Sequence, residues 1–249
     1  MRDFTVVMYR RLLLELMQQG YSFQTFYDFL QHPQPRAAVI RHDIDSRKRN
    51  SLHFALLEQA LDLKTTYYFR ILPKSYDPVI MNLIIGMGHE IGYHYEDLTL
   101  ARGDVSKAKE LFEEHLSEFR KICPVKTICM HGSPLSKFDN RDLWKHISYR
   151  DYGITGEPYF DVDFSKVLYL TDTGRRWDNK QISVRDKVKS TFDLHFVSTM
   201  DIIKNSNRLP DQVMLNFHPQ RWNDNILPWI TELVVQNTKN LVKRYFFVK

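Results

Sequence analysis

The chain has 249 residues, of which 43% are hydrophobic and 13% aromatic, and its 35 basic and 30 acidic side chains give a formal net charge of +5. This composition favours a folded, enzyme-sized protein, and the basic excess is too small to require nucleic acid as a partner. The two cysteines, Cys123 and Cys129, are too few for a disulfide framework, which favours a reducing compartment.

The N-terminal stretch "MRDFTVVMYRRLLLELMQQGYSF" predicts an amphipathic helix, because charged residues interrupt its apolar positions. No other window has the apolar length of a membrane span, since "VIMNLIIGMG" at 79–88 is short and contains two glycines. We therefore expect a soluble, cytoplasmic protein without a membrane span.

Predicted strands and helices then alternate along the chain. Strands are expected at 37–45, 64–71, 89–96, 125–132, 166–172 and 212–219, and helices at 47–61, 78–85, 105–122, 139–147, 199–206 and 224–243. Residues 149–190 are rich in aromatic residues, Gly and Pro, which predicts long ordered loops around the strand there. The alternation predicts an α/β fold with a parallel sheet, open or closed into a barrel.

Polar side chains follow the predicted strands at the points where they end. Active sites of parallel α/β folds lie at the carboxyl ends of the strands. We therefore expect one polar cluster built from remote segments, and its candidate members are Asp43, Asp45, Arg70, His94, His131, Asp172 and His218.

Asp43 and Asp45, in "AVIRHDID", are two residues apart on an extended chain and therefore share a face, while His42 points to the other side. Two carboxylates this close resist joint ionisation unless a cation or a proton lies between them. A metal ion satisfies this condition if one acid binds it and the other takes a proton from its water. The alternative is that Asp45 and Ser46 cap the following helix.

The stretch "GHEIGYHYE" at 88–96 carries a second group of polar side chains. His94 lies on the same strand face as Glu90, Gly92 and Glu96, whereas His89 lies on the opposite face. Only one of the two histidines can therefore point into a shared site while the strand stays regular.

Within that stretch, "GHEIGYH" resembles the second motif of the polysaccharide deacetylases, which are carbohydrate esterase family 4 and carry the NodB-homology domain. In that motif Gly-His-Glu-Ile-Gly precedes a metal-binding histidine. "HDID" resembles a variant first motif in which two aspartates flank one residue. The resemblance implies that Asp43 is the catalytic base and that Asp45 and His94 bind the metal.

Three later segments are similar to the family's remaining motifs in order and spacing: "CMHGSP" at 129–134, "TDTGRRWD" at 171–178 and "MLNFHP" at 214–219. The last implies that His218 is the general acid. The resemblance implies a distorted (β/α)7 barrel over 36–220, within a single catalytic domain of residues 1–249. Residues 1–35 would form an N-terminal helical extension and residues 221–249 a C-terminal helix.

The chain departs from the family pattern at two positions. Leu98 stands where the family has its second metal-binding histidine, and zinc sites ordinarily use three protein ligands. The third ligand would then be His131 or Glu96, and we prefer His131. The third-motif arginine that pairs with the base is also missing, so that Arg70, Arg175 or Arg176 would have to replace it.

The resemblance implies a metal-dependent hydrolase, with Zn²⁺ the first candidate metal, that removes an acetyl group from an N-acetylated sugar or glycan precursor. In "GRRW", Arg175 and Arg176 either clamp an anionic substrate or bind acidic loop residues, namely Asp161, Asp163 and Asp172. The aromatic residues Tyr152, Tyr159, Phe160 and Trp177 either stack on sugar rings or pack within the loops. The alternative functions are a degenerate member that binds carbohydrate without hydrolysing it, and a metal-dependent amidase acting on a non-sugar amide.

Overall fold

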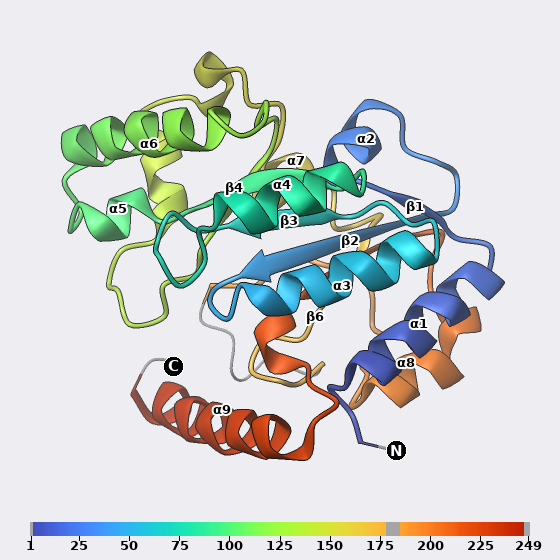
Figure 1. Cartoon of the computed structure of the whole chain (residues 1–249). Coiled ribbons are helices and arrows are strands. Elements are labelled where there is room, and N and C mark those ends of the chain that lie inside the picture. Colours follow the sequence, from blue (N-terminus) through green and yellow to red (C-terminus); the bar gives the residue numbers. More distant parts are fainter. Residues whose placement is uncertain (1, 178–184, 247–249) are drawn as a thin grey trace.

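The computed structural model describes residues 2–177 and 185–246, and it shows a parallel β-sheet with helices packed against it (Figure 1). The strands of the described part are β1 Ser22–Gln24, β2 Ala37–Ile44, β3 Thr66–Phe69, β4 Glu90–Tyr95, β5 Ile128–Met130, β6 Leu168–Thr171 and β7 Gln212–Phe217. They follow the order β5-β4-β3-β2-β7-β6, and β1 pairs with the first residues of β2.

Every pairing between these strands is parallel, which confirms the predicted α/β fold with a parallel sheet. The sheet stays open and does not close into a full barrel, since the two strands at the ends of its order, β5 and β6, do not pair with each other in the described residues. The carboxyl ends of the strands therefore converge on one side of the sheet, as the sequence predicts.

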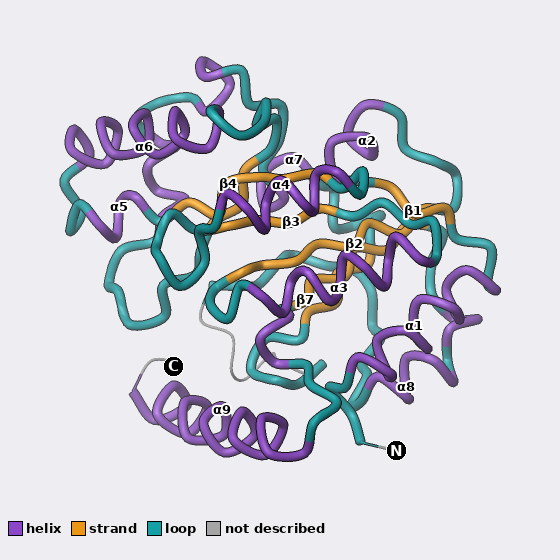
Figure 2. The backbone as a smooth tube through the Cα atoms, in the orientation of Figure 1, coloured by secondary structure: helices purple, strands orange, loops and turns teal. Residues whose placement is uncertain are grey.

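The helices match most of the predicted ranges (Figure 2). The α-helices are α1 Val6–Gln18, α2 Phe26–Gln31, α3 Arg49–Ala60, α4 Pro78–Gly86, α5 Asp97–Leu100, α6 Val105–Arg120, α7 Pro158–Asp161, α8 Thr199–Lys204 and α9 Ile226–Phe246. Short 3-10 helices occupy Asn140–Lys145, Tyr149–Tyr152, Ser206–Arg208 and Pro219–Arg221. Among the described helices, none combines the length and the apolar character that crossing a membrane requires.

The first 35 residues are more than the helical extension that we expected. β1 lies beside β2 in register Ser22 with Ala37, so this segment contributes a strand to the sheet. α1 begins after Thr5, whose side chain accepts a hydrogen bond from the Met8 amide, and its apolar face is buried in the main core. The segment is therefore part of the same folded unit as the sheet.

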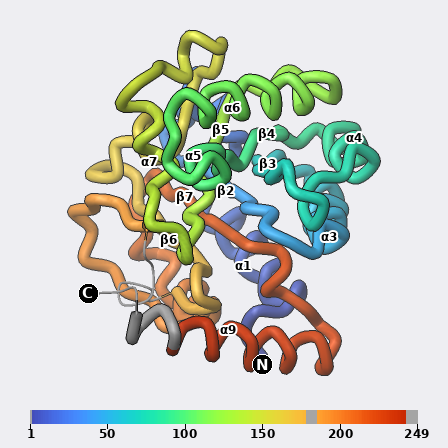
Figure 3. Tube along the Cα trace, turned by 90° about the vertical axis from the view of Figure 1, so that its left-hand side faces the viewer, coloured from blue at the N-terminus to red at the C-terminus, as the bar shows by residue number. Residues whose placement is uncertain are grey.

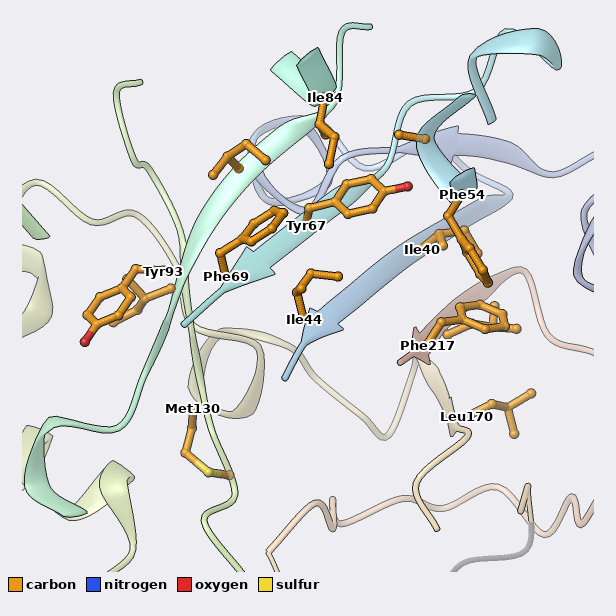
Figure 4. Close-up of a cluster of buried hydrophobic side chains, with 14 of the residues drawn as sticks. Ile40, Ile44, Phe54, Tyr67, Phe69, Ile84, Tyr93, Met130, Leu170 and Phe217 are labelled. Atoms are coloured by element: carbon orange, nitrogen blue, oxygen red, sulfur yellow. The ribbon is translucent and has the colours of Figure 1, made fainter. Parts of the chain in front are cut away.

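The outer face of the sheet packs against helices and forms the larger of the two hydrophobic clusters. Figure 4 shows Ile40 and Ile44 of β2 beside Tyr67 and Phe69 of β3, with Phe54 of α3 over them. These residues alternate with the polar positions of the same strands, as the period of two requires.

The inner face of the sheet carries a smaller apolar cluster, which includes Val39, Tyr68, Cys129 and Met214. On β4 this face is occupied at Gly92, where an added Cβ would lie 2.3 Å from the Tyr68 ring and 2.8 Å from the Thr127 carbonyl oxygen. The glycine of "GHEIGYH" thus leaves room for a neighbouring aromatic ring. The polar residues of the site lie further along the same strand faces, at the carboxyl ends of the strands.

α9 lies beside the N-terminus of the chain, as Figure 3 shows in side view. Trp229 donates a hydrogen bond to the carbonyl oxygen of Asp3 at 2.7 Å, and Glu232 forms an ion pair with Arg47 at 3.2 Å. Arg47 belongs to the loop between β2 and α3. The C-terminal helix therefore contacts the loop that follows β2 and begins with Asp45.

Candidate metal-binding and catalytic site

A pocket of about 90 Å³ lies at the carboxyl ends of the strands, and its walls combine acidic side chains with imidazoles. Asp43, Asp45, His94, His131 and His218 come from strands or the residues directly after them, and Tyr159 comes from α7. The predicted convergence of strand ends is therefore present in the fold.

Asp43 lines this pocket and is 3% exposed. Its Oδ2 accepts hydrogen bonds from Arg41 Nη2 at 3.1 Å and from Asn216 Nδ2 at 2.9 Å. Among the described residues its buried Oδ1 accepts none. One carboxylate oxygen is thus fixed by two donors, while the other is available to a water or substrate in the pocket.

Asp45 follows directly after β2, and three imidazoles surround its carboxylate. His131 Nε2 lies 3.5 Å and His94 Nε2 3.6 Å from its Oδ1, and His218 Nε2 lies 3.9 Å from its Oδ2. The buried Oδ1 accepts no hydrogen bond from any described residue. Adjacent ligand atoms in a tetrahedral zinc site, with bonds of about 2.0 Å, lie about 3.3 Å apart, so these separations suit ligands of one metal.

Each of the three histidines is held through its other ring nitrogen. His94 Nδ1 donates to the Cys129 carbonyl oxygen at 2.9 Å, and His131 Nδ1 to Glu96 Oε2 at 2.9 Å. His218 Nδ1 donates to Asp172 Oδ1 at 2.6 Å. With Nδ1 protonated in this way, the Nε2 atoms of the neutral rings present lone pairs toward Asp45, which is the arrangement of metal-binding histidines.

Asp172 is fully buried and is satisfied by four donors. Besides the His218 ring, its carboxylate accepts hydrogen bonds from the His218 amide at 3.0 Å, from Arg221 Nη1 at 2.8 Å and from Trp222 Nε1 at 2.6 Å. These hydrogen bonds fix the orientation of His218. Although burial opposes ionisation of Asp172, its contacts with His218 and Arg221 lower its pKa.

The pKa values of the ionisable groups in the site follow from burial and from their close contacts with one another. Burial alone would raise the pKa of Asp45, but His131 and His94 outweigh it and hold that pKa well below its usual range. Burial likewise opposes ionisation of Glu96, yet its contacts with His131 and Arg70 lower its pKa to about 2. For His131 burial dominates and lowers the pKa, which favours the neutral imidazole that a metal requires.

The donor set fits a divalent metal held by Asp45, His94 and His131. A second set, formed by Asp43, His94 and Cys129, brings three ligand atoms within 4.8 Å of one another. However, burial raises the pKa of the Cys129 thiol well above its ordinary value, and a thiol binds metal as the thiolate. The first set needs no such ionisation, so we favour it.

The arginine expected to pair with Asp43 is none of the three that the sequence suggested. Arg70 binds Glu96 through Nε at 2.6 Å and Nη2 at 2.5 Å, while Arg175 lies over the Trp229 ring at 4.3 Å. Arg176 is exposed and is not among the residues that line the pocket. Arg41 takes the role instead, and its position two residues before Asp43 is the signal that could have identified it.

Several candidate contacts of the 149–177 region also differ from expectation. Trp177 donates to Thr199 Oγ1 at 2.9 Å and packs in the main core, away from the pocket. The acidic loop residues pair with other cations, because Asp161 binds Arg150, Asp163 binds Lys166 and Asp172 binds Arg221. Of the four aromatic residues considered for stacking, Tyr159 lines the pocket.

The capping alternative for Asp45 is wrong. α3 begins at Arg49 with Lys48 at its N-cap, and no side chain caps that end of the helix. Sequence reasoning missed Asn216, which precedes His218 by two residues on β7 and therefore faces the same side of the strand. It also missed Arg185, which lines the pocket and donates to the Gly132 and Ser133 carbonyl oxygens.

No family model and no curated protein matches this sequence. Several solved structures align with it at low identity, and three of them are described below. A CE4 family pseudoenzyme from Bacillus anthracis shares 10% identity over 87% of this chain, with a TM-score of 0.47, and this chain covers 64% of its length. A family 4 carbohydrate esterase from Streptomyces lividans, in complex with acetate, shares 17% identity over 82% of this chain and 88% of its own, with a TM-score of 0.42.

A CE4 esterase from Streptococcus mutans shares 14% identity over 93% of this chain and 92% of its own, with a TM-score of 0.45. This chain spans less than two thirds of the length of the Bacillus protein. The structures to which it is similar are thus carbohydrate esterases of family 4 and a pseudoenzyme of that family, which is the family that the sequence motifs resemble.

Proposed function

We propose that this protein is a metal-dependent hydrolase that removes an acyl group from the nitrogen of an amino sugar. The observation that carries the proposal is the convergence of three imidazole Nε2 atoms on the Asp45 carboxylate, at 3.5 to 3.9 Å. Each of these rings is fixed by a hydrogen bond from its Nδ1. A core histidine without a ligand role has no need of this shared orientation.

Asp45, His94 and His131 would hold the metal, and Zn²⁺ is the first candidate because aspartate oxygen and imidazole nitrogen are among its usual ligands. When bound, such a metal lowers the pKa of a coordinated water and polarises a carbonyl group. His131 then takes the place of the family histidine that Leu98 replaces.

Asp43 is the general base in this proposal. Its Oδ1 accepts no hydrogen bond from the described residues and can receive a proton from the attacking water. Arg41 and Asn216 hold Oδ2, so the carboxylate cannot turn away from the pocket. The buried Arg41 guanidinium also forms an ion pair with this carboxylate at 3.1 Å.

His218 is the general acid. When its ring carries both protons, Asp172 stabilises the imidazolium through Nδ1, and Nε2 can donate its proton to the departing amine. The ordered pair of His218 and Asp172 therefore acts at the opposite side of Asp45 from His131. Tyr159 lies in the pocket wall, where its ring can contact the sugar.

The substrate class and location are proposed from the cysteines and from the residues that line the pocket. Both cysteines are free thiols, which supports a reducing compartment such as the cytoplasm. A soluble N-acetylated sugar or glycan precursor is the corresponding substrate. The arginines that suggested an anionic substrate, Arg175 and Arg176, do not line the pocket, whereas Arg185 and Arg221 do.

The proposal is tested by metal content and acetate release together. Protein purified without chelator should contain one divalent ion per chain and release acetate from N-acetylated sugars more readily than from non-sugar acyl amides. Asp43→Asn and His218→Gln should each lower kcat by about 10²- to 10⁴-fold. Asp163→Asn is the matched control, because this carboxylate is 54% exposed and pairs with Lys166 outside the pocket.

Three results would contradict parts of the proposal. Protein without metal, whose sugar binding is unchanged in Asp43→Asn and His218→Gln, would identify a carbohydrate-binding protein without hydrolytic activity. Metal-containing protein that prefers non-sugar amides would identify an amidase. Equal activity of wild type and both variants would exclude these two residues from the chemistry.

A further inference from the structure

We propose that Glu96 is a positioning residue that sets the metal affinity of this site by orienting His131, and that Arg70 holds Glu96 for this purpose. The inference rests on the proposed function, because it assigns a role toward the same metal. Glu96 would act on the metal only indirectly, through the imidazole of His131.

The contacts form a continuous chain from Arg70 to Asp45. Arg70 donates two hydrogen bonds to Glu96 Oε1, from Nε at 2.6 Å and from Nη2 at 2.5 Å. Glu96 Oε2 accepts from His131 Nδ1 at 2.9 Å, and His131 Nε2 lies 3.5 Å from Asp45 Oδ1. Arg70 and Glu96 are at most 5% exposed, so solvent screens these contacts weakly.

His131 has particular need of such support. It follows β5 and stands in a loop where Ser133 has a left-handed backbone with φ of 37°, whereas His94 lies within β4. Its backbone is held by the Tyr95 carbonyl oxygen at 2.9 Å and by Asn140 at 2.8 Å. The orientation of its ring, however, depends on acceptors at Nδ1, which are Glu96 and Ser133 Oγ.

The same contacts argue against Glu96 as a ligand itself. Oε1 is occupied by two guanidinium nitrogens, and Oε2 accepts from His131 and from Ser133 Oγ at 3.3 Å. To bind the metal, Glu96 would have to give up the hydrogen bond that orients His131. Either His131 or Glu96 was expected to supply the missing ligand. The geometry points instead to His131 as the ligand and to Glu96 as the residue that orients it.

The test is Co²⁺ binding to metal-stripped protein, measured by chelator competition, with the visible spectrum of bound Co²⁺ as the second readout. Glu96→Gln should weaken binding by about 10- to 100-fold, which is the usual effect of losing a partner of a metal-binding histidine. The Co²⁺ spectrum should keep the band intensity of wild type, because the number of ligands stays the same. Glu90→Gln is the matched control, since Glu90 is a half-buried carboxylate at the other end of β4 that binds Tyr27, Thr66 and Thr127.

A double-mutant comparison separates positioning from a general effect on the fold. In the His131→Ala background, Glu96→Gln should change Co²⁺ affinity by less than about twofold, because Glu96 then has no ring to orient. If Glu96→Gln does not fold, Arg70→Lys provides the same comparison, because it loses the two-point contact with Glu96. Arg70→Lys should weaken Co²⁺ binding when His131 is present and leave it unchanged in the His131→Ala background.

Affinity unchanged in Glu96→Gln would overturn the inference, and so would an equal loss in the presence and absence of His131. A change in Co²⁺ band intensity in Glu96→Gln would show that Glu96 is a ligand, which also overturns it. In each of these cases wild type still binds the ion, so the proposed function stands. Wild type that binds no Co²⁺ refutes the proposed function and this inference together.

Discussion

Replacing Asp172 by asparagine tests the most heavily hydrogen-bonded carboxylate of the site. Each of its oxygens accepts from two donors: Oδ1 from the His218 ring and Arg221, and Oδ2 from the His218 amide and Trp222. Asparagine has the same shape but only one carbonyl oxygen. Its NH₂ group must therefore face two donors, whichever way the side chain turns.

The expected loss of stability follows from those contacts. Two hydrogen bonds to a charged group, each worth about 1.5–3 kcal/mol, are removed, which gives about 3–6 kcal/mol. Breaking a buried ion pair from one side costs about 3–5 kcal/mol, and Asp172 is fully buried beside Arg221. We therefore expect Asp172→Asn to lower the free energy of unfolding by about 3–5 kcal/mol.

The assay is urea denaturation at neutral pH, with a chelator present so that metal affinity does not enter the comparison. Asp211→Asn is the control, because Asp211 is 75% exposed and pairs with Arg36 at the surface, where such a pair contributes about 1 kcal/mol or less. A loss below about 1 kcal/mol for Asp172→Asn would refute the view that these four donors depend on the carboxylate.

Three further measurements test other parts of the structure. Burial raises the pKa of Glu157 from 4.5 to about 7, so the folded protein keeps this proton at pH values where the unfolded chain has lost it. The stability that this carboxyl contributes is present below pH 4.5 and is lost as the pH rises through about 7. We expect the unfolding free energy of Glu157→Gln to rise by about 3 kcal/mol relative to that of wild type over this range. A difference between the two proteins that does not change with pH would contradict this prediction. Gly92→Ala should lower the free energy of unfolding, measured in urea, by about 1–3 kcal/mol, because the added Cβ would clash with the Tyr68 ring. Gly86→Ala should not lower it, because no atom lies within 4 Å of the Cβ added there. Equal effects of the two substitutions would contradict the close packing at Gly92. Arg41→Leu should lower kcat with little change in KM, because the guanidinium contacts the base, and a change confined to KM would place Arg41 in substrate binding instead.

Most of the sheet could be predicted from the sequence, because period-two alternation and β-branched or aromatic runs identify buried strands. The same alternation correctly placed Asp43 on one face of β2 and His42 on the other, where His42 binds the buried Glu58 at 2.6 Å. It also placed His94 and Glu96 on the inner face of β4. β1 was missed because a strand of three residues carries too little pattern to be recognised.

Partners of individual charges could not be predicted in this way. Arg70 and Glu96 are 26 residues apart in sequence, and only the parallel register of β3 beside β4 brings them together. Trp177 and Arg175 looked like site residues because they follow a strand end, yet each points toward packed helices or the core. Residues that follow a strand within a loop have no periodicity that fixes where their side chains point.

The pairing of Arg41 with Asp43 within one strand has a consequence for how this site tolerates change. The two residues are neighbours on one face of β2, so their contact depends on strand geometry and not on a distant loop. Insertions or deletions in the loop after β5 would leave this contact between Arg41 and Asp43 in place. The ion pair of Asp43 is therefore encoded within one strand, whereas His131 depends on the loop after β5 for its position.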